Sequence, residues 1–131
     1  MTAPLVVVAE DDEDILLLVA TRLGRDGFDV VEAREGHEAL KLVRERQPVV
    51  AVIDIGMPGL DGLELTRLIR ADESVRGTLV VLLTARAQEA DVRLGFDAGA
   101  DLYIRKPFSP AKLSTSVREL MKRQSSAGGG A

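Results

Sequence analysis

The sequence predicts a single α/β domain in which one parallel sheet is covered by helices on both faces. Short runs of aliphatic and β-branched residues alternate with longer segments of helical periodicity along the chain. The apolar runs are continuous, as expected for strands that are buried on both faces. The length of 131 residues is that of one domain with one core.

Two helices separate the three strands that are predicted in the first half of the chain. The strands are expected at Leu5–Ala9, 29–32 and 49–54, and the helices at 14–25 and Gly36–Arg46. Gly27 and Pro48 follow the two helices, where glycine and proline commonly end a helix. The run at 49–54 is the most apolar, so we expect it at the centre of the sheet.

Three more helices and two more strands are predicted in the second half. The helices are expected at 60–71 and 88–98 and from Ser109-Pro110 onward, and the strands at 78–83 and Leu102–Arg105. The helix at 60–71 is expected to bury Leu60, Leu63 and Leu68. Ser109 is a favourable helix cap, and proline is tolerated in the first turn. These elements make a doubly wound (βα)5 domain, in which ligands bind at the carboxyl ends of the strands.

The domain is expected to cover residues 4–123. The remaining residues, 124–131, are rich in serine and glycine and poor in apolar side chains. Such a composition is typical of a flexible tail or of the start of a linker.

Composition excludes several classes of function. The net charge is −4 and the pI is about 5.0, with no lysine and arginine cluster, so direct nucleic-acid binding is not expected. The absence of cysteine excludes disulfides, thiol catalysis and thiolate metal sites. The apolar runs are far shorter than the roughly 20 residues that span a bilayer, and no secretory signal is present, so a cytoplasmic location without membrane contact is expected.

Polar side chains follow four of the predicted strands, at the point where each strand ends. They are Glu10 and Asp11 with Asp12, then Asp54, Thr84 and Lys106-Pro107. Each of these features alone would be an ordinary turn, helix cap or solvated acidic run. In a parallel sheet, however, the carboxyl ends of all strands meet at one edge, so we expect these side chains to lie together.

Such a cluster predicts a site for a divalent cation and a phosphoryl group. Carboxylates about 4 Å apart repel each other by on the order of 4 kcal/mol per pair at an effective dielectric near 20. Oxygen ligands without histidine or cysteine favour Mg²⁺. A carboxylate beside the metal can attack phosphorus and form an acyl phosphate, while a lysine and a hydroxyl hold the other phosphoryl oxygens.

Four stretches of the sequence resemble the receiver domain of bacterial two-component response regulators. They are VVVAEDDEDI, VIDIGMPGLDG, VVLLTA and GADLYIRKPFSP, and the likeness covers about residues 4–123. The resemblance implies the CheY-like, flavodoxin-like fold, with five parallel strands in the order 2-1-3-4-5.

The resemblance also assigns a role to each residue of the predicted site. Asp54 is identified as the phospho-accepting aspartate of a phosphoprotein. Asp11 would bind Mg²⁺ directly, Glu10 through water, and Gly56 through its backbone carbonyl. Thr84 resembles the switch hydroxyl and Lys106 the lysine that pairs with the phosphoryl group.

Four further positions are interpreted beside that site. Tyr103 resembles the family's switch aromatic, with a plain core aromatic as the competing interpretation. Lys106-Pro107 matches the place of a cis peptide bond in the family. Gly56 and Arg86 stand where they would influence the attack of hydrolytic water. His37 is interpreted as a surface residue that neither binds a metal nor donates a phosphoryl group.

The function implied by the resemblance is a phosphorylation-dependent signalling switch and not a classical enzyme. A sensor histidine kinase or a phosphotransfer protein would phosphorylate Asp54 with Mg²⁺ as cofactor. Thr84 and Tyr103 would relay the change to the face of the fourth helix, fifth strand and fifth helix. That face would act on a downstream effector domain or target protein, or would form a homodimer, although Leu102 stands where DNA-binding regulators often have a second aspartate for that pairing.

Three alternative functions compete with this interpretation. A receiver that signals without phosphorylation would not need the intact set of aspartate, threonine and lysine. An aspartate-nucleophile phosphatase of the haloacid dehalogenase type would have a second aspartate at Gly56 and a cap domain. A flavodoxin-like cofactor binder would have a phosphate loop where Glu10, Asp11 and Asp12 would repel a phosphate.

Overall fold

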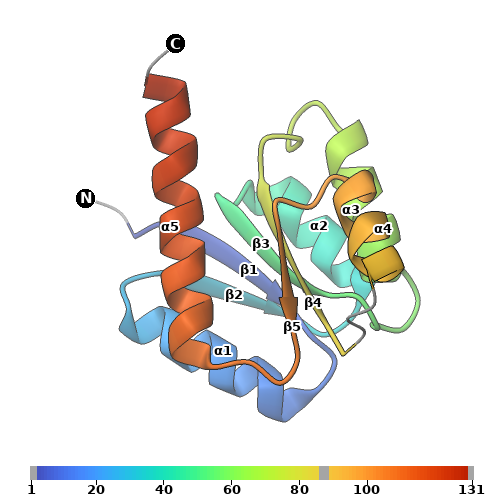
Figure 1. Ribbon diagram of the computed structural model, residues 1–131, viewed down its shortest axis with the longest axis horizontal. Helices are drawn as coiled ribbons and strands as arrows, with labels where there is room; N and C mark the ends of the chain where they lie inside the picture. The colour runs from blue at the N-terminus through green and yellow to red at the C-terminus, as the bar shows by residue number, and fades with distance from the viewer. Residues whose placement is uncertain (1–2, 86–88, 130–131) are drawn as a thin grey trace.

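The computed structural model describes residues 3–85 and 89–129, which form a five-stranded parallel sheet with five helices (Figure 1). The strands are β1 (Leu5–Ala9), β2 (Asp29–Ala33), β3 (Val50–Asp54), β4 (Leu79–Thr84) and β5 (Leu102–Arg105). The helices are α1 (Glu13–Arg25), α2 (Gly36–Arg46), α3 (Gly62–Ala71), α4 (Glu89–Ala98) and α5 (Pro110–Gly129). The sheet order is β2-β1-β3-β4-β5, which confirms the predicted fold class and topology.

The helices divide into two layers that cover opposite faces of the sheet. In Figure 1, α1 and α5 lie on one side and α2, α3 and α4 on the other. Successive residues of a strand point to opposite faces, so Val52 packs toward α1 and α5 while Ile53 packs toward α2 and α3. All five residues of β3 are buried, which agrees with its predicted central position.

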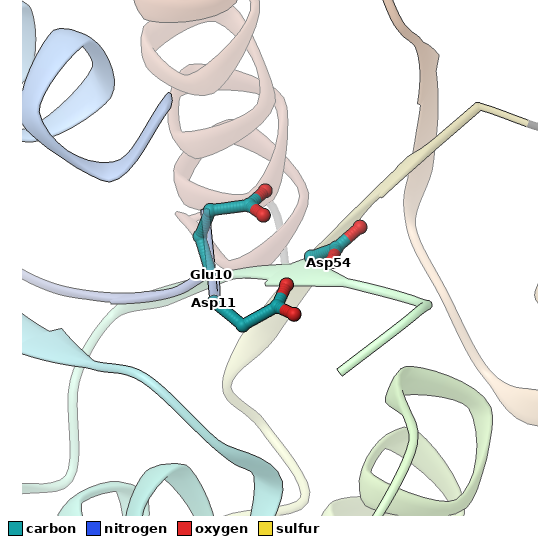
Figure 2. A group of neighbouring side chains, drawn as sticks. All are labelled: Glu10, Asp11 and Asp54. Carbon is teal, nitrogen blue, oxygen red and sulfur yellow. The ribbon is translucent and has the colours of Figure 1, made fainter. Parts of the chain in front are cut away.

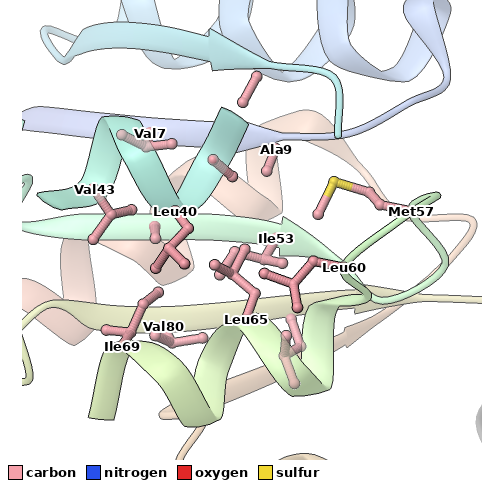
Figure 3. Packing of buried hydrophobic residues seen from close by; sticks show 14 of the residues in the cluster. Val7, Ala9, Leu40, Val43, Ile53, Met57, Leu60, Leu65, Ile69 and Val80 are labelled. Atoms are coloured by element: carbon pink, nitrogen blue, oxygen red, sulfur yellow. The ribbon is translucent and has the colours of Figure 1, made fainter. Parts of the chain in front are cut away.

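Two apolar clusters make up the core on the two faces. Figure 3 shows the cluster under α2 and α3, in which Val7 and Ile53 of the sheet meet Leu40, Val43, Leu65 and Ile69 of the helices. The opposite cluster joins the sheet to Leu16 and Val19 of α1 and to Leu113 and Val117 of α5. The two clusters together bury both faces of the sheet.

The burial predicted for Leu68 is wrong. This side chain is 38% exposed, whereas Leu65 and Ile69 are fully buried. Residues four apart lie on the same face of a helix, so the inward face of α3 runs through Leu65 and Ile69 and leaves Leu68 on the flank. Leu60 is buried as expected, but it precedes the helix, because Asp61 caps α3 by accepting a hydrogen bond from the Glu64 N–H at 2.9 Å.

The last helix continues into the segment that was predicted to be a tail. α5 runs to Gly129, six residues beyond the expected domain boundary. Serine and glycine weaken a helix, but unlike proline they keep the N–H groups that extend its hydrogen-bond ladder. The use of this segment as a tail or linker stays a prediction, and residues 130–131 lie outside the described residues. Within the described residues, no helix combines the length and the apolar character that crossing a membrane requires.

Candidate functional site

Three carboxylates meet at the carboxyl end of the sheet. Glu10 and Asp11 follow β1, and Asp54 ends β3, which pairs directly with β1 through Ala9 and Ile53. One carboxylate oxygen from each of the three residues lies within 4.8 Å of the others. Figure 2 shows the carboxylates of Glu10 and Asp11 directed toward the side on which Asp54 stands. The parallel pairing of neighbouring strands therefore creates the acidic cluster.

The three acidic residues differ in their access to solvent. Glu10 is completely buried and Asp54 is 5% exposed, whereas Asp11 is exposed. A buried charge is costly unless it is paired. Glu10 therefore needs the contacts that surround it, and Asp11 provides the cluster with an oxygen at the solvent boundary.

Lys106 supplies the opposite charge to both buried carboxylates. Its Nζ lies 3.0 Å from Oε2 of Glu10 and 3.1 Å from Oδ1 of Asp54. The loop that holds Lys106 is fixed by its backbone N–H, which donates to the carbonyl of Thr84 at 2.7 Å. The Lys106-Pro107 peptide bond is cis, as the family resemblance implies.

Burial changes the acidity of the site. Desolvation raises the pKa of Glu10 to about 7, and the hydrogen bonds from Lys106 and from the Asp12 N–H only partly oppose it. Burial likewise raises the pKa of Asp54 against the effect of Lys106. Burial also acts against the charge of Lys106, but its hydrogen bonds to Glu10 and Asp54 prevail and raise its pKa. Further positive charge beside these groups would lower the pKa of both carboxyl groups.

The residues fit a hard divalent cation. Three carboxylates face one ammonium group, so the cluster keeps an excess of negative charge. Oε2 of Glu10 is buried 3.0 Å from the Lys106 ammonium, and the hydrogen bond between them is poorly aligned. An oxygen-only ligand set with one exposed member matches the chemistry of Mg²⁺, which keeps several water ligands.

Thr84 and Gly56 stand beside Asp54, as predicted. Thr84 ends β4 and is 3% exposed. A Cβ at Gly56 would lie 3.8 Å from Oδ2 of Asp54, so the position of this residue next to the carboxylate is established. A hollow of about 460 Å³ opens here, and its lining includes Asp54, Gly56, Thr84 and Lys106. It offers room for a small ligand at the carboxylate.

The other residues singled out in the sequence lie farther from the carboxylates or outside the described residues. Tyr103 on β5 is partly buried and packs against the core under α2 and α3. His37 is exposed on α2, which agrees with its interpretation as a surface residue. Arg86 lies outside the described residues.

Sequence reasoning missed the part that Asp12 plays in building the site. Its carboxylate caps α1 by accepting hydrogen bonds from the Asp14 and Ile15 N–H groups at 3.0 and 3.2 Å. Its own N–H donates to Oε1 of Glu10 at 3.1 Å. An aspartate just before a helical segment is a recognised cap signal, but the contact with Glu10 requires the fold.

A comparison with protein families gives one match that covers most of the chain. The family described as "Response regulator receiver domain" matches residues 6–118.

Curated relatives include three bacterial regulators. The chain is 42% identical over 125 residues to the transcriptional regulatory protein CseB of Streptomyces coelicolor, which corresponds to 95% of this chain and 52% of that protein. It is 37% identical over 118 residues to the DNA-binding response regulator MtrA of Mycobacterium tuberculosis (90% and 50%). It is 36% identical over 118 residues to the alkaline phosphatase synthesis transcriptional regulatory protein PhoP of Bacillus subtilis (90% and 48%). The chain thus spans about half the length of these relatives.

Solved structures of similar shape are receiver domains. The receiver domain of the Francisella response regulator 1452 has a TM-score of 0.86 at 36% identity, covering 92% of this chain and 98% of that one. A CheY-like receiver domain protein from Methanospirillum hungatei has a TM-score of 0.89 at 25% identity, with coverage of 96% and 99%.

Proposed function

The chain belongs to the response regulator receiver domain family, and on that premise we propose that Asp54 accepts a phosphoryl group from a histidine kinase or a phosphotransfer protein. Membership in this family connects the chain with phosphorylation-based two-component signalling, in which such domains are regulatory and not classical enzymes. The observation that carries the proposal is the position of Asp54, which is nearly buried in the acidic cluster and lies 3.1 Å from the Lys106 ammonium.

The proposed transfer is a nucleophilic substitution at phosphorus. A carboxylate oxygen of Asp54 forms the new bond to phosphorus while the bond from phosphorus to the donor nitrogen breaks, and the donor imidazole keeps the electron pair. The Lys106 ammonium, which already faces Oδ1 of Asp54, stabilises negative charge on the phosphoryl oxygens. Thr84, at the same edge, provides a hydroxyl within the hollow that would receive the phosphoryl group.

We assign the metal ligands to this chain's own oxygens. Asp11 and Asp54 would bind Mg²⁺ directly, Glu10 through water, and Gly56 through its carbonyl. When bound, Mg²⁺ supplies charge neutralisation and orients the phosphoryl oxygens. The assignment is supported by the closeness of the Glu10, Asp11 and Asp54 oxygens, which lie within 4.8 Å of one another.

The phosphorylated state is proposed to act through the α4, β5 and α5 face. A phosphoryl group adds about −1.5 to −2 charge near neutral pH and can bias a two-state region. Thr84 and Tyr103 would relay that change, because Thr84 ends β4 and Tyr103 lies on β5, the strand that pairs with β4. The partner of this face is a downstream effector domain or target protein, or a second copy of the chain. The proposed switch acts in the cytoplasm, and this domain itself does not contact nucleic acid.

The experiment is phosphorylation by a small donor. Purified protein is incubated with Mg²⁺ and acetyl phosphate, and intact-mass spectrometry and hydroxylamine sensitivity detect an acyl phosphate. We expect the adduct on the parent chain, and none with Asp54→Asn or with a chelator. Asp14→Asn, an exposed aspartate in the first turn of α1, is the matched control and should be labelled normally. Equal labelling of Asp54→Asn would contradict the proposal.

A further inference from the structure

The ring of Tyr103 lies against the backbone of Gly95 in α4. A Cβ atom at residue 95 would stand 2.8 Å from Cδ2 and 2.9 Å from Cε2 of Tyr103. Favourable carbon–carbon contacts occur at about 3.5–4.0 Å. A side chain as small as a methyl group at residue 95 would therefore collide with the ring in its present position.

The surroundings of the ring leave it little room to retreat on the side of the sheet. Tyr103 pairs in register with Leu82 on β4, and Cδ1 of Leu82 would itself lie 3.2 Å from the added Cβ. The ring of Phe96 flanks Tyr103 with its centroid 6.4 Å away, and Phe96 is 46% exposed. The ring thus occupies a position bounded by α4 and β4, with the half-exposed Phe96 beside it.

Glycine inside a helix is unfavourable unless something requires it. Among the common residues only proline is a poorer helix former. Gly24 in α1 offers a comparison, because a Cβ there would meet nothing within 4 Å. Alanine would fit at residue 24 but not at residue 95, so the close approach of the Tyr103 ring explains the glycine in α4.

We propose that Gly95, by lacking a side chain, makes room for the Tyr103 ring. It thereby sets the equilibrium between this ring position and the one adopted after phosphorylation. The regulatory part rests on the proposed function, in which Tyr103 relays the state of Asp54. Gly95 is a positioning residue that acts through Tyr103. A methyl group at residue 95 raises the free energy of the present ring position and so shifts the population toward the alternative position.

The chain provides a direct probe of this ring. Tyr103 is its only tyrosine, so fluorotyrosine labelling gives a single ¹⁹F NMR signal that reports on this position alone. In the unphosphorylated protein we expect Gly95→Ala to move that signal, while the matched control Gly24→Ala leaves it at the parent position. A signal unchanged in Gly95→Ala would overturn the proposal.

The response to phosphorylation separates a regulatory role from a merely structural one. With Mg²⁺ and acetyl phosphate, the ¹⁹F signal of the parent should move. The signal of Gly95→Ala should move less, because in part of its molecules the Tyr103 ring has already left its position against residue 95. A full-sized movement in Gly95→Ala, or no movement in a parent chain that is phosphorylated on Asp54, would overturn the regulatory part. Failure of Asp54 to be labelled at all would instead contradict the proposed function. The comparison of unphosphorylated variants would still test whether Gly95 makes room for the Tyr103 ring.

A denaturation cycle keeps the proposal testable if Gly95→Ala folds poorly. Gly95→Ala should lower the midpoint of urea unfolding when Tyr103 is present, and should not lower it in a Tyr103→Ala background, where helix propensity favours alanine. An equal lowering in both backgrounds would show that residue 95 does not act through the ring.

Discussion

At the scale of single residues, the carboxylate of Glu10 is the most constrained group of the site. It is fully buried, accepts from the Asp12 N–H at 3.1 Å and faces the Lys106 ammonium at 3.0 Å. Even so, desolvation raises its pKa from 4.5 to about 7. The Asp12 N–H and the Lys106 ammonium therefore offset only part of the cost of burying the charge of Glu10.

The raised pKa of Glu10 predicts a stability that falls as the pH rises. Between pH 4.5 and about 7 the folded chain holds a proton at Glu10 that the unfolded chain has lost. The free energy of unfolding therefore decreases through this window, by up to about 3 kcal/mol from Glu10, and Asp54 acts in the same direction. Asp26 and Asp72, whose pKa values are lowered, act at more acidic pH and leave this window unaffected.

Urea denaturation in the presence of a chelator, at several pH values from 5 to 8, checks this expectation. Glu10→Gln should flatten the pH dependence, because the amide does not titrate. Glu119→Gln, an exposed position on α5, is the control and should keep the parent slope. A stability that rises over this range would contradict the argument.

At the scale of elements, Arg70 joins α3 to the beginning of β4 and β5. Its guanidinium donates to the carbonyls of Gly99, Arg76 and Thr78 at 2.9, 2.9 and 2.6 Å, and to Oδ2 of Asp101 at 2.7 Å. Gly99 has a φ of +112°, and a Cβ there would lie 2.6 Å from Cγ of Arg70. The glycine that ends α4 therefore also makes room for the arginine.

We expect Arg70→Lys to lower the free energy of unfolding by about 1–3 kcal/mol, because an ammonium cannot reproduce the planar set of donors. Arg44→Lys is the matched control, since Arg44 forms an exposed ion pair with Asp72 at 3.0 Å. Such pairs contribute about 0–1 kcal/mol, so this change should have the smaller effect. Chemical denaturation measures both changes. Equal decreases in the free energy of unfolding would show that the Arg70 contacts stabilise the fold no more than an exposed ion pair does.

At the scale of the whole molecule, the parallel sheet brings residues that are distant in sequence to one edge. Glu10, Asp54 and Lys106 come from three separate strand ends, yet they form two ion pairs with a common lysine. Ligand binding at this edge should therefore stabilise the entire domain, because the ligands are assembled only in the folded chain.

Mg²⁺ is expected to raise the melting temperature of the parent chain. At a concentration 100 times its dissociation constant, a ligand of the folded state adds about 2.7 kcal/mol. Asp11→Asn should remove most of this gain, and Asp14→Asn should retain it, since Asp14 lies outside the acidic cluster. Thermal unfolding at matched ionic strength measures the effect, and an equal gain in both variants would indicate general charge screening.

The sequence by itself determined the class of the fold and which polar residues meet at the carboxyl edge of the sheet. Continuous apolar runs allowed each strand to be placed within one residue at either end, and β1 and β5 were predicted without error. Polar residues directly after four strands identified the acidic and lysine positions, because strand ends must share one edge in a parallel sheet. These features depend on local pattern, which the sequence carries directly.

Only the tertiary structure decided which of those groups touch, and how deeply each is buried. The inward face of α3 excludes Leu68, α5 continues past Gln124, and Lys106 contacts Glu10 as well as Asp54. The closeness of Gly95 to the ring of Tyr103 likewise appears only when α4 packs on β5. Contacts and desolvation depend on how elements pack in space, and residue spacing along the chain does not contain that information.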